Sequence, residues 1–242
     1  LSSQETPDDL DELLALGNPT PLPVEDVYRQ YTKANRRLIV LGLLGTLIEF
    51  SAFKDIQPID DAVWKDLLNL SSDPRNTVVV ISGRDRALVS QWLGDLPVWI
   101  AAENGMYYRL GNRSVQWQQS ELAQDLDDEW ISSITPVFRY FEERTPGSVT
   151  ETQEHSITWH YREADEDFGE IQASVLQEHL EKVLGNQPVE VSLDSKQLQV
   201  RPYAISKGSV LDPIFEELGL GYSRESKRED AEKLAERESE RE

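Results

Sequence analysis

The sequence has 242 residues, 38% of them hydrophobic, so the chain can bury a sizeable core in one large domain or in a domain with a smaller insert. Its 45 acidic and 24 basic residues give a formal charge of −21, which repels nucleic acid and anionic lipid and excludes both as partners. The absence of cysteine excludes disulfides, thiolate nucleophiles and cysteine metal sites.

The N-terminal residues 1–23 are acidic and end in NPTPLP, a composition that predicts a linker. An apolar run of about 20 residues is missing, and the N-terminus is acidic where a signal peptide is basic. These features predict a cytoplasmic protein without a membrane partner. Because the sequence begins without methionine, we expect it to be a segment of a longer chain.

The stretch RRLIVLGLLGTLIEF, residues 36–50, reads as a strand that runs into a tight turn. Its continuous apolar run predicts a central parallel strand, and open α/β sheets place their sites at the carboxyl ends of such strands. Gly42, Leu43 and Leu44 stand at that end. None of the three carries a reactive side chain.

Strands and helices then alternate, which predicts an α/β fold with a parallel sheet and helices on its faces. The expected elements are strand 37–44, helix 60–70, strand 77–82, helix 86–93 and strand 98–103. Residues 106–110 and 114–118 flank Gly-Asn at 111–112, a hairpin signal that predicts an antiparallel edge.

The second half of the chain changes character after a helix expected near residues 122–144. Alternating strands and one long helix predict an inserted α/β cap domain at 147–200, between core segments 24–146 and 201–222. The segment 206–220 predicts a capped helix that rejoins the main sheet, and residues 223–242 form a charged tail.

Two strand-to-helix junctions carry polar groups that could hold a phosphate. The SGRD segment, from Ser82 to Asp85, follows an apolar strand directly, and Lys207 stands at a second junction. The alternative for Ser82 is an ordinary helix N-cap, and the alternative for Lys207 is a surface lysine. The three histidines, at 155, 160 and 179, lack metal-site spacing, so structural or solvated roles are expected.

Taken in order, LxLLGTL, ISGRD, AAENG, the ITWHYREADEDFGEIQASVLQEHL segment and VRPYAISKG resemble trehalose-6-phosphate phosphatase domains of the haloacid-dehalogenase (HAD) superfamily. LPxEDxxxxY, AAENGM and YFxERTP resemble most closely the phosphatase-like C-terminal domain of plant-type trehalose-6-phosphate synthases. The resemblance implies a HAD-like Rossmannoid core with a parallel sheet and an inserted cap domain. It also implies an upstream synthase glycosyltransferase domain as partner.

Active members of this family carry D-x-D-G-T, in which the first aspartate attacks phosphorus and binds Mg²⁺ and the second protonates the leaving oxygen. Gly42 and Leu44 occupy those positions here. The family's later G-D-D-x-x-D/E motif is also absent from this sequence. The resemblance therefore predicts no catalytic residues, no metal site and no cofactor, with Mg²⁺ expected only if the phosphatase is active.

The resemblance implies that Thr46, Ser82, Gly83, Arg84 and Lys207 could still bind phosphate. These five residues could equally be retained from active relatives without binding a ligand.

The sugar-binding positions of the family's cap correspond here to Glu151, Gln153 and Gln199, so one charge pair and one acceptor are lost. The resemblance therefore implies a catalytically inactive regulatory or assembly domain of a trehalose-6-phosphate synthase. The alternatives are a module that senses trehalose 6-phosphate and an active phosphatase whose acids are displaced to Glu49, Asp85 or Glu103.

Overall fold

A computed structural model describes residues 23–49, 58–111, 116–123, 128–194 and 196–220. The chain divides into two units, with the division between Arg37 and Leu38. In the N-terminal unit, α2 (Val24–Lys33) begins after Pro23, has Glu25 and Asp26 in its first turn and ends at Lys33, which suits the helix dipole. The charged tail at 223–242 and the linker up to residue 22 lie outside the described residues.

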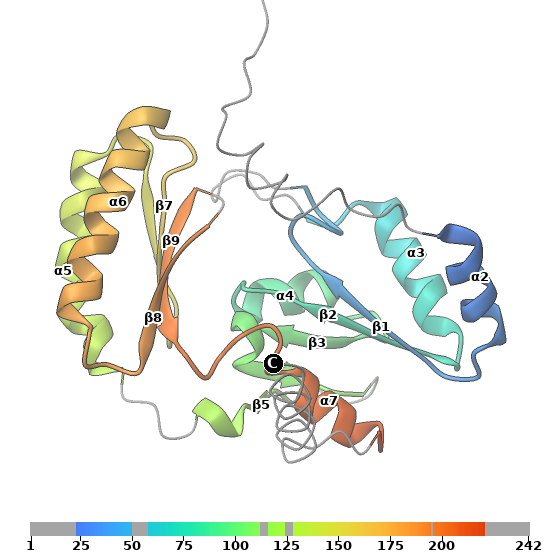
Figure 1. Cartoon of the computed structure of the whole chain (residues 1–242). Coiled ribbons are helices and arrows are strands. Elements are labelled where there is room, and N and C mark those ends of the chain that lie inside the picture. The colour runs from blue at the N-terminus through green and yellow to red at the C-terminus, as the bar shows by residue number, and fades with distance from the viewer. Residues whose placement is uncertain (1–22, 50–57, 112–115, 124–127, 195, 221–242) are drawn as a thin grey trace, which may run out of the picture. The chain divides into compact units, whose positions relative to one another are not determined.

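The first sheet has the order β1-β2-β3-β4-β5, formed by β1 (Arg37–Gly42), β2 (Asn76–Ile81), β3 (Trp99–Ala102), β4 (Tyr107–Arg109) and β5 (Gln118–Gln119). β2 and β3 are parallel, with Val79 opposite Trp99, whereas β4 runs antiparallel to both of its neighbours. The predicted α/β class and antiparallel edge are therefore confirmed. Figure 1 shows this sheet with its helices.

The position of β1 corrects one prediction. Within the described part of the chain β1 is an edge strand, beside β2 only, and not the central strand that its apolar run predicts. Its residues are half-buried or, at Val40, 41% exposed, whereas Val79 and Val80 in β2 are fully buried. The sequence of β1 suits a strand with both faces covered, and among the described strands only β2 lies beside it.

Helices cover both faces of this sheet. The α3 helix (Asp61–Ser72) and the α4 helix (Arg86–Leu93) contribute Leu67, Val89 and Leu93 to one cluster, with alternate residues of β2 and β3. The α7 helix (Leu211–Glu217) contributes Ile214 to a cluster on the other face. It has no side-chain cap, so the prediction of a capped helix from residue 206 is wrong. Ser206 and Ser209 instead bond each other in the preceding turn.

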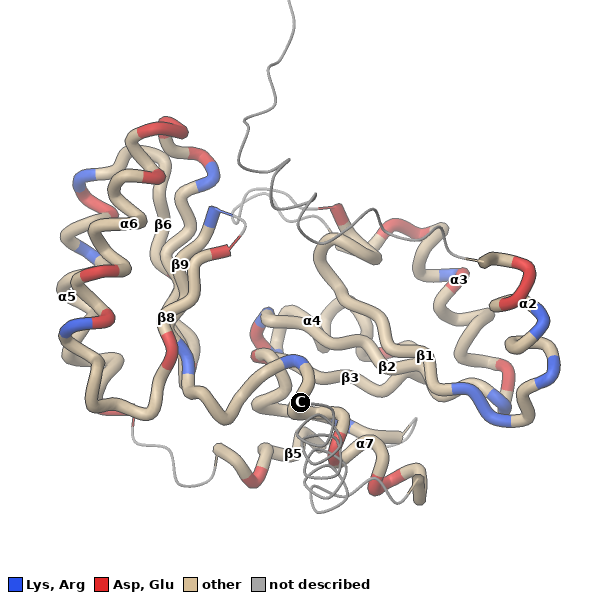
Figure 2. Tube along the Cα trace, in the orientation of Figure 1, with Lys and Arg blue, Asp and Glu red and all other residues tan. Residues whose placement is uncertain are grey.

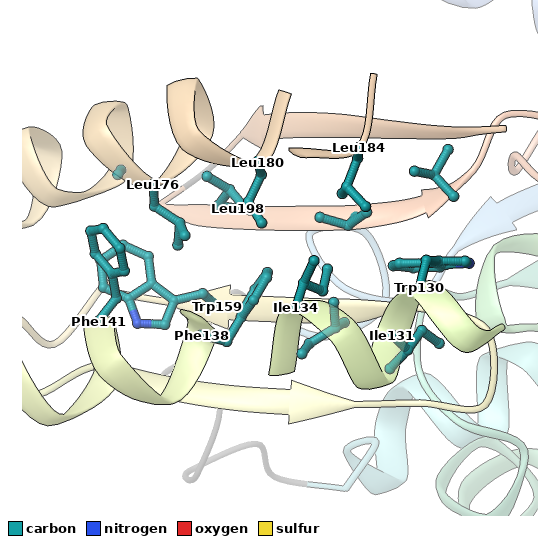
Figure 3. Packing of buried hydrophobic residues seen from close by; sticks show 14 of the residues in the cluster. Trp130, Ile131, Ile134, Phe138, Phe141, Trp159, Leu176, Leu180, Leu184 and Leu198 are labelled. Atoms are coloured by element: carbon teal, nitrogen blue, oxygen red, sulfur yellow. The ribbon is translucent and has the colours of Figure 1, made fainter. Parts of the chain in front are cut away.

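The second sheet has the order β6-β7-β9-β8 and is antiparallel throughout. Its strands are β6 (Val149–Thr152), β7 (Ile157–His160), β8 (Val189–Asp194) and β9 (Gln197–Pro202). One face carries α5 (Glu129–Arg144) and α6 (Glu166–Val183), and Figure 3 shows the core between them, around Trp159, Phe138 and Leu198. The α5 helix precedes the predicted cap boundary at residue 147, yet it packs into this core.

Because strand side chains alternate, the other face of this sheet is polar. Ile157, Trp159, Leu198 and Val200 point into the helix-covered core, so Thr158, His160 and Gln199 lie on the opposite face. Glu151 lies opposite Thr158, and Thr158 opposite Gln199, which places the three in one row across three strands. No described helix is long and apolar enough to cross a membrane.

Candidate functional site

A cavity of about 120 Å³, called here the crevice, brings together residues from the ends of the first sheet and the polar face of the second. From the first sheet and its loops come Leu43, Leu44, Ile81, Ser82, Gly83, Arg84, Asn104 and Lys207. From the second sheet come Glu151, Gln153, Thr158, His160, Asp194, Gln197 and Gln199.

The crevice therefore contains most of the residues that the sequence singled out for ligand binding. Ser82, Gly83, Arg84 and Lys207 of the phosphate set and all three sugar-binding candidates line it. Thr46, the remaining residue of the phosphate set, and Gly42, at the position of the family's nucleophile, lie at the end of β1. A Cβ at Gly42 would lie 3.2 Å from Thr46 Oγ1. Neither Gly42 nor Thr46 is among the lining residues.

The loop from Ser82 to Asp85 is held by the backbone of the neighbouring strand end. Ser82 N–H donates to Ala101, Asn104 N–H donates to Ser82, and the Ser82 hydroxyl accepts from Arg84 N–H at 3.0 Å. The predicted alternative, Ser82 as a helix N-cap, is wrong, because Asp85 caps α4 by accepting from Leu88 N–H. Ser82 is thus a buried turn residue facing the crevice.

Gly83 lies in close contact with the side chain of Asn104. A Cβ at Gly83 would lie 3.0 Å from Asn104 Oδ1, and Asn104 adopts a positive φ of 57° in the short turn after β3. The carbonyl of Gly83 accepts from Gln153 Nε2 at 3.0 Å. A Cβ at this position would therefore require the Asn104 amide to shift by a few tenths of an ångström.

Arg84 is the central charge of the crevice, and Glu151 already pairs with it. Its Nη1 lies 3.1 Å from Glu151 Oε2, and the two side chains are 10% and 14% exposed. Glu151 also contacts His160 Nε2 at 3.0 Å and accepts from Gln153 Nε2 at 3.1 Å. Burial lowers the pKa of Arg84, and the Glu151 carboxylate acts against this shift. The guanidinium remains a cation near neutral pH, since arginine side chains keep their proton in proteins.

Sequence reasoning missed several members of this site. His160 was expected to be structural, yet it lines the crevice beside Glu151. The Thr158 hydroxyl accepts from Gln199 Nε2 at 3.0 Å. Both residues follow from the alternation in SITWHY, which places them opposite the buried Ile157 and Trp159. The other two histidines fit the expectation: His179 is exposed, and His155 pairs with Asp128 at 2.7 Å.

A second polar cluster, beside the crevice, ties the two sheets together. Arg86 pairs with Glu103 at 3.2 Å and with Glu154 at 2.6 Å, and its guanidinium lies 3.5 Å from the centre of the Tyr107 ring. The Tyr107 hydroxyl donates to Glu154 at 2.7 Å. Burial raises the pKa of Glu103, against the effect of Arg86, and the bond from Tyr107 lowers the pKa of Glu154.

The three carboxylates considered as displaced acids do not line the crevice. Asp85 is engaged as the N-cap of α4, Glu103 is buried against Arg86, and Glu49 is exposed. The crevice residues also do not fit Mg²⁺, which needs several oxygen ligands. The crevice has two carboxylates, and one of them, Glu151, is paired with Arg84. Within the described ranges, no group of three or more acidic or histidine side chains is placed to hold a metal.

Residues 41–230 match the family model described as trehalose-phosphatase, a span that includes the whole crevice. The chain belongs to the trehalose-phosphatase family. Among solved structures, the C-terminal domain of a Candida albicans trehalose-6-phosphate phosphatase is 33% identical with a TM-score of 0.74, covering 79% of this chain and 65% of that one. A trehalose-6-phosphate phosphatase of Aspergillus fumigatus is 35% identical with a TM-score of 0.54, covering 84% and 74%. These matches confirm the HAD-like fold.

Long relatives of the trehalose-phosphatase family also match. A trehalose-phosphate synthase of Arabidopsis thaliana is 36% identical over 218 residues, which are 83% of this chain and 22% of the relative. A Dictyostelium discoideum synthase is 34% identical over 198 residues, 82% of this chain and 25% of the relative. The chain thus spans about a quarter of the length of these synthases. A Candida albicans trehalose synthase regulatory protein, at 17% identity and a TM-score of 0.65, shares the fold.

Proposed function

We propose that this chain is a catalytically inactive, phosphatase-like regulatory domain of a cytoplasmic trehalose-6-phosphate synthase, and that its crevice binds a sugar phosphate without hydrolysing it. The observation that carries the proposal is the end of β1, where Gly42 and Leu44 bring no carboxylate to the crevice. A phosphatase of this family needs one carboxylate to attack phosphorus and one to protonate the leaving group. The relatives of about four times this length support an upstream glycosyltransferase domain as partner.

The remaining residues support binding. Ser82, Arg84 and Lys207 can contact phosphoryl oxygens, and Glu151, Gln153, Thr158 and Gln199 offer hydrogen-bond partners to a polyol. Lys207 is the exposed cation of the set, while Arg84 is held by Glu151. Binding is therefore expected to be weak and to depend on Lys207.

Phosphate release from trehalose 6-phosphate with Mg²⁺ tests the inactive state. We expect none above background, and turnover near 1 per second would contradict the proposal, since that is an ordinary enzymatic rate. The double variant Gly42→Asp with Leu44→Asp is expected to stay inactive as well. A Cβ at residue 42 would press on Thr46 Oγ1, and Glu151, one of the two carboxylates of the crevice, is already paired with Arg84.

Ligand-detected NMR with trehalose 6-phosphate and with inorganic phosphate tests binding. We expect signals for the wild type that weaken in Lys207→Ala and persist in the control Lys65→Ala, which removes another exposed lysine, on α3. Equal signals for Lys207→Ala and the wild type, or no signal for either, would show that the crevice keeps the family's form without binding an anion through Lys207. The domain would then act through its surfaces alone.

A further inference from the structure

One carboxylate oxygen of Glu151 contacts two basic side chains, Arg84 and His160. Glu151 Oε2 lies 3.1 Å from Arg84 Nη1 and 3.0 Å from His160 Nε2, and these three residues are called here the charge triad. The side chain of Arg84 is 10% exposed, and those of Glu151 and His160 are 14% exposed. Because so little water reaches the triad, its charges act strongly on one another and on a bound ion.

The net charge of the charge triad depends on one proton of His160. An ionised carboxylate only accepts hydrogen bonds, so the contact with Glu151 assigns the proton of neutral His160 to Nε2. In that state the charges of Arg84 and Glu151 cancel. When Nδ1 takes up a second proton, Nε2 still donates to Glu151, and the triad gains a net positive charge. The same geometry therefore suits both protonation states.

The surroundings of His160 include two more charged residues, Lys207 and Asp194, which also line the crevice. Gln197, opposite His160 across the pair of β7 and β9, is uncharged. Carboxylate, lysine and arginine side chains ordinarily stay ionised from about pH 6 to 8, whereas histidine titrates in that range. Figure 2 shows many charged residues on α5 and α6 and few along the strands beside them. One proton on His160 therefore changes the local charge of the crevice appreciably.

We propose that anion binding in the crevice is coupled to proton uptake by His160, so that the domain binds the phosphate group of its ligand more tightly as the pH falls. The inference rests on the proposed function, in which Arg84 and Lys207 bind that group. A bound anion stabilises the protonated triad more than the neutral one, because only the protonated triad has a net positive charge. By linkage, protonation of His160 strengthens the anion site by the same factor.

The coupling would make the crevice respond to two signals, the concentration of its ligand and the pH. The response comes from residues of both sheets, since Arg84 follows β2 while Glu151 and His160 belong to β6 and β7. A regulatory domain with this site would bind its ligand more fully when the surroundings become acidic near neutral pH.

Sulfate is the probe of choice because its charge is constant near neutral pH, whereas a phosphate group titrates in the same range. NMR titration of the 242-residue chain with sulfate at pH 6 and at pH 8, at constant ionic strength, gives the ratio of the two affinities. We expect sulfate to bind about tenfold more tightly at pH 6, which lies within the usual range of coupling between two sites.

Two matched variants assign the proton. In His160→Gln the amide can still donate to Glu151 but cannot take up a proton, so the affinities at the two pH values should be equal and close to that of the wild type at pH 8. The control is His179→Gln, which removes an exposed histidine of α6 that does not line the crevice. It should keep the tenfold ratio. Circular dichroism checks that both variants are folded.

Proton uptake by the wild type gives a second readout that needs no change in the crevice. The chain contains three histidines, so their ring resonances can be followed individually by NMR as the pH is varied. Saturating sulfate should raise the pH at which His160 is half protonated by about one unit, the counterpart of a tenfold change in affinity. The exposed His179 should not respond to sulfate.

The possible outcomes separate the coupling from the proposed function. Equal sulfate affinities at pH 6 and pH 8, with an unchanged titration of His160, would overturn the coupling and leave anion binding in place. A pH dependence that persists in His160→Gln would assign the proton to a different group and overturn the coupling as well. Absence of sulfate binding at both pH values would contradict the proposed binding of a sugar phosphate, and the coupling with it.

Discussion

Replacing Glu151 by glutamine should make the crevice a better anion site. The Glu151 carboxylate lies 3.1 Å from Arg84 and is largely buried with it, so it occupies the cation that a phosphate group would use. Glutamine keeps the length of the side chain and can still accept hydrogen bonds from Gln153 and His160. Glu151→Gln therefore removes the competing charge with little change of shape.

The size of the effect follows from the distances in the crevice. An anion bound to Arg84 would lie roughly 5–6 Å from the Glu151 carboxylate, where two unit charges repel by about 3 kcal/mol at an effective dielectric constant near 20. Water in the open crevice reduces this, and we expect about 1–2 kcal/mol. Inorganic phosphate should then bind about tenfold more tightly to Glu151→Gln than to the wild type.

Phosphate titration followed by NMR measures this ratio below the melting temperature of each variant. The control is Glu190→Gln, which makes the same isosteric change in the Glu190–Arg201 ion pair, outside the crevice. It changes the net charge equally and should leave the affinity unaltered. Equal phosphate affinity of Glu151→Gln and the wild type would refute the assignment of Arg84 as an anion-binding residue.

Four further measurements test the fold and the charges. In a urea titration, Gly147→Ala should lower the unfolding free energy by about 3 kcal/mol, because its φ is +92° and a Cβ would overlap the Glu163 carbonyl. The control Gly111→Ala, with a φ of +89° and no described atom within 4 Å of the added Cβ, should lower it by about 1 kcal/mol. Trp159→Ala empties the fully buried centre of the second core and should lower the unfolding free energy by about 3–5 kcal/mol in the same assay. Burial raises the pKa of Glu103, so the protonated carboxyl stabilises the fold below its ordinary pKa of 4.5, and this stabilisation is lost as pH rises through the raised value. Relative to Glu103→Gln, the wild type should therefore gain unfolding free energy as pH falls from 7 toward 4.5. Melting temperatures with and without millimolar Mg²⁺ should agree, and an upward shift would indicate a cation site.

Local patterns in the sequence predicted most of the fold. The order of strands and helices, the antiparallel edge at β4 and β5, and the helices α3 and α4 follow from periodicity and turn residues. Alternation in β7 and β9 also separates buried from polar positions, whereas Gln199 was a site candidate through the family resemblance. These features depend on residues close together in the chain, where periodicity carries the information.

The errors concern relations between distant segments. The apolar run of β1 predicts that both of its faces are covered. It does not predict which strands lie beside β1, because strand order depends on the whole chain. The pairing of Arg84 with Glu151 joins residues 67 positions apart, so no local pattern reveals it. The alternative of Ser82 as a helix N-cap fails because Asp85, three residues later, takes that role.

The pairing of Arg84 with Glu151 also explains how the crevice can persist without a ligand. A buried guanidinium with no partner would be strongly destabilising, and a phosphate that supplied the missing charge would become necessary for folding. Glu151 supplies that charge from within the chain, with His160 and Gln153 bonded to the carboxylate. At the end of β1, Gly42 and Leu44 place no carboxylates that would need Mg²⁺ to offset their repulsion. We therefore expect the folded state to need neither phosphate nor metal, which suits the proposed regulatory role.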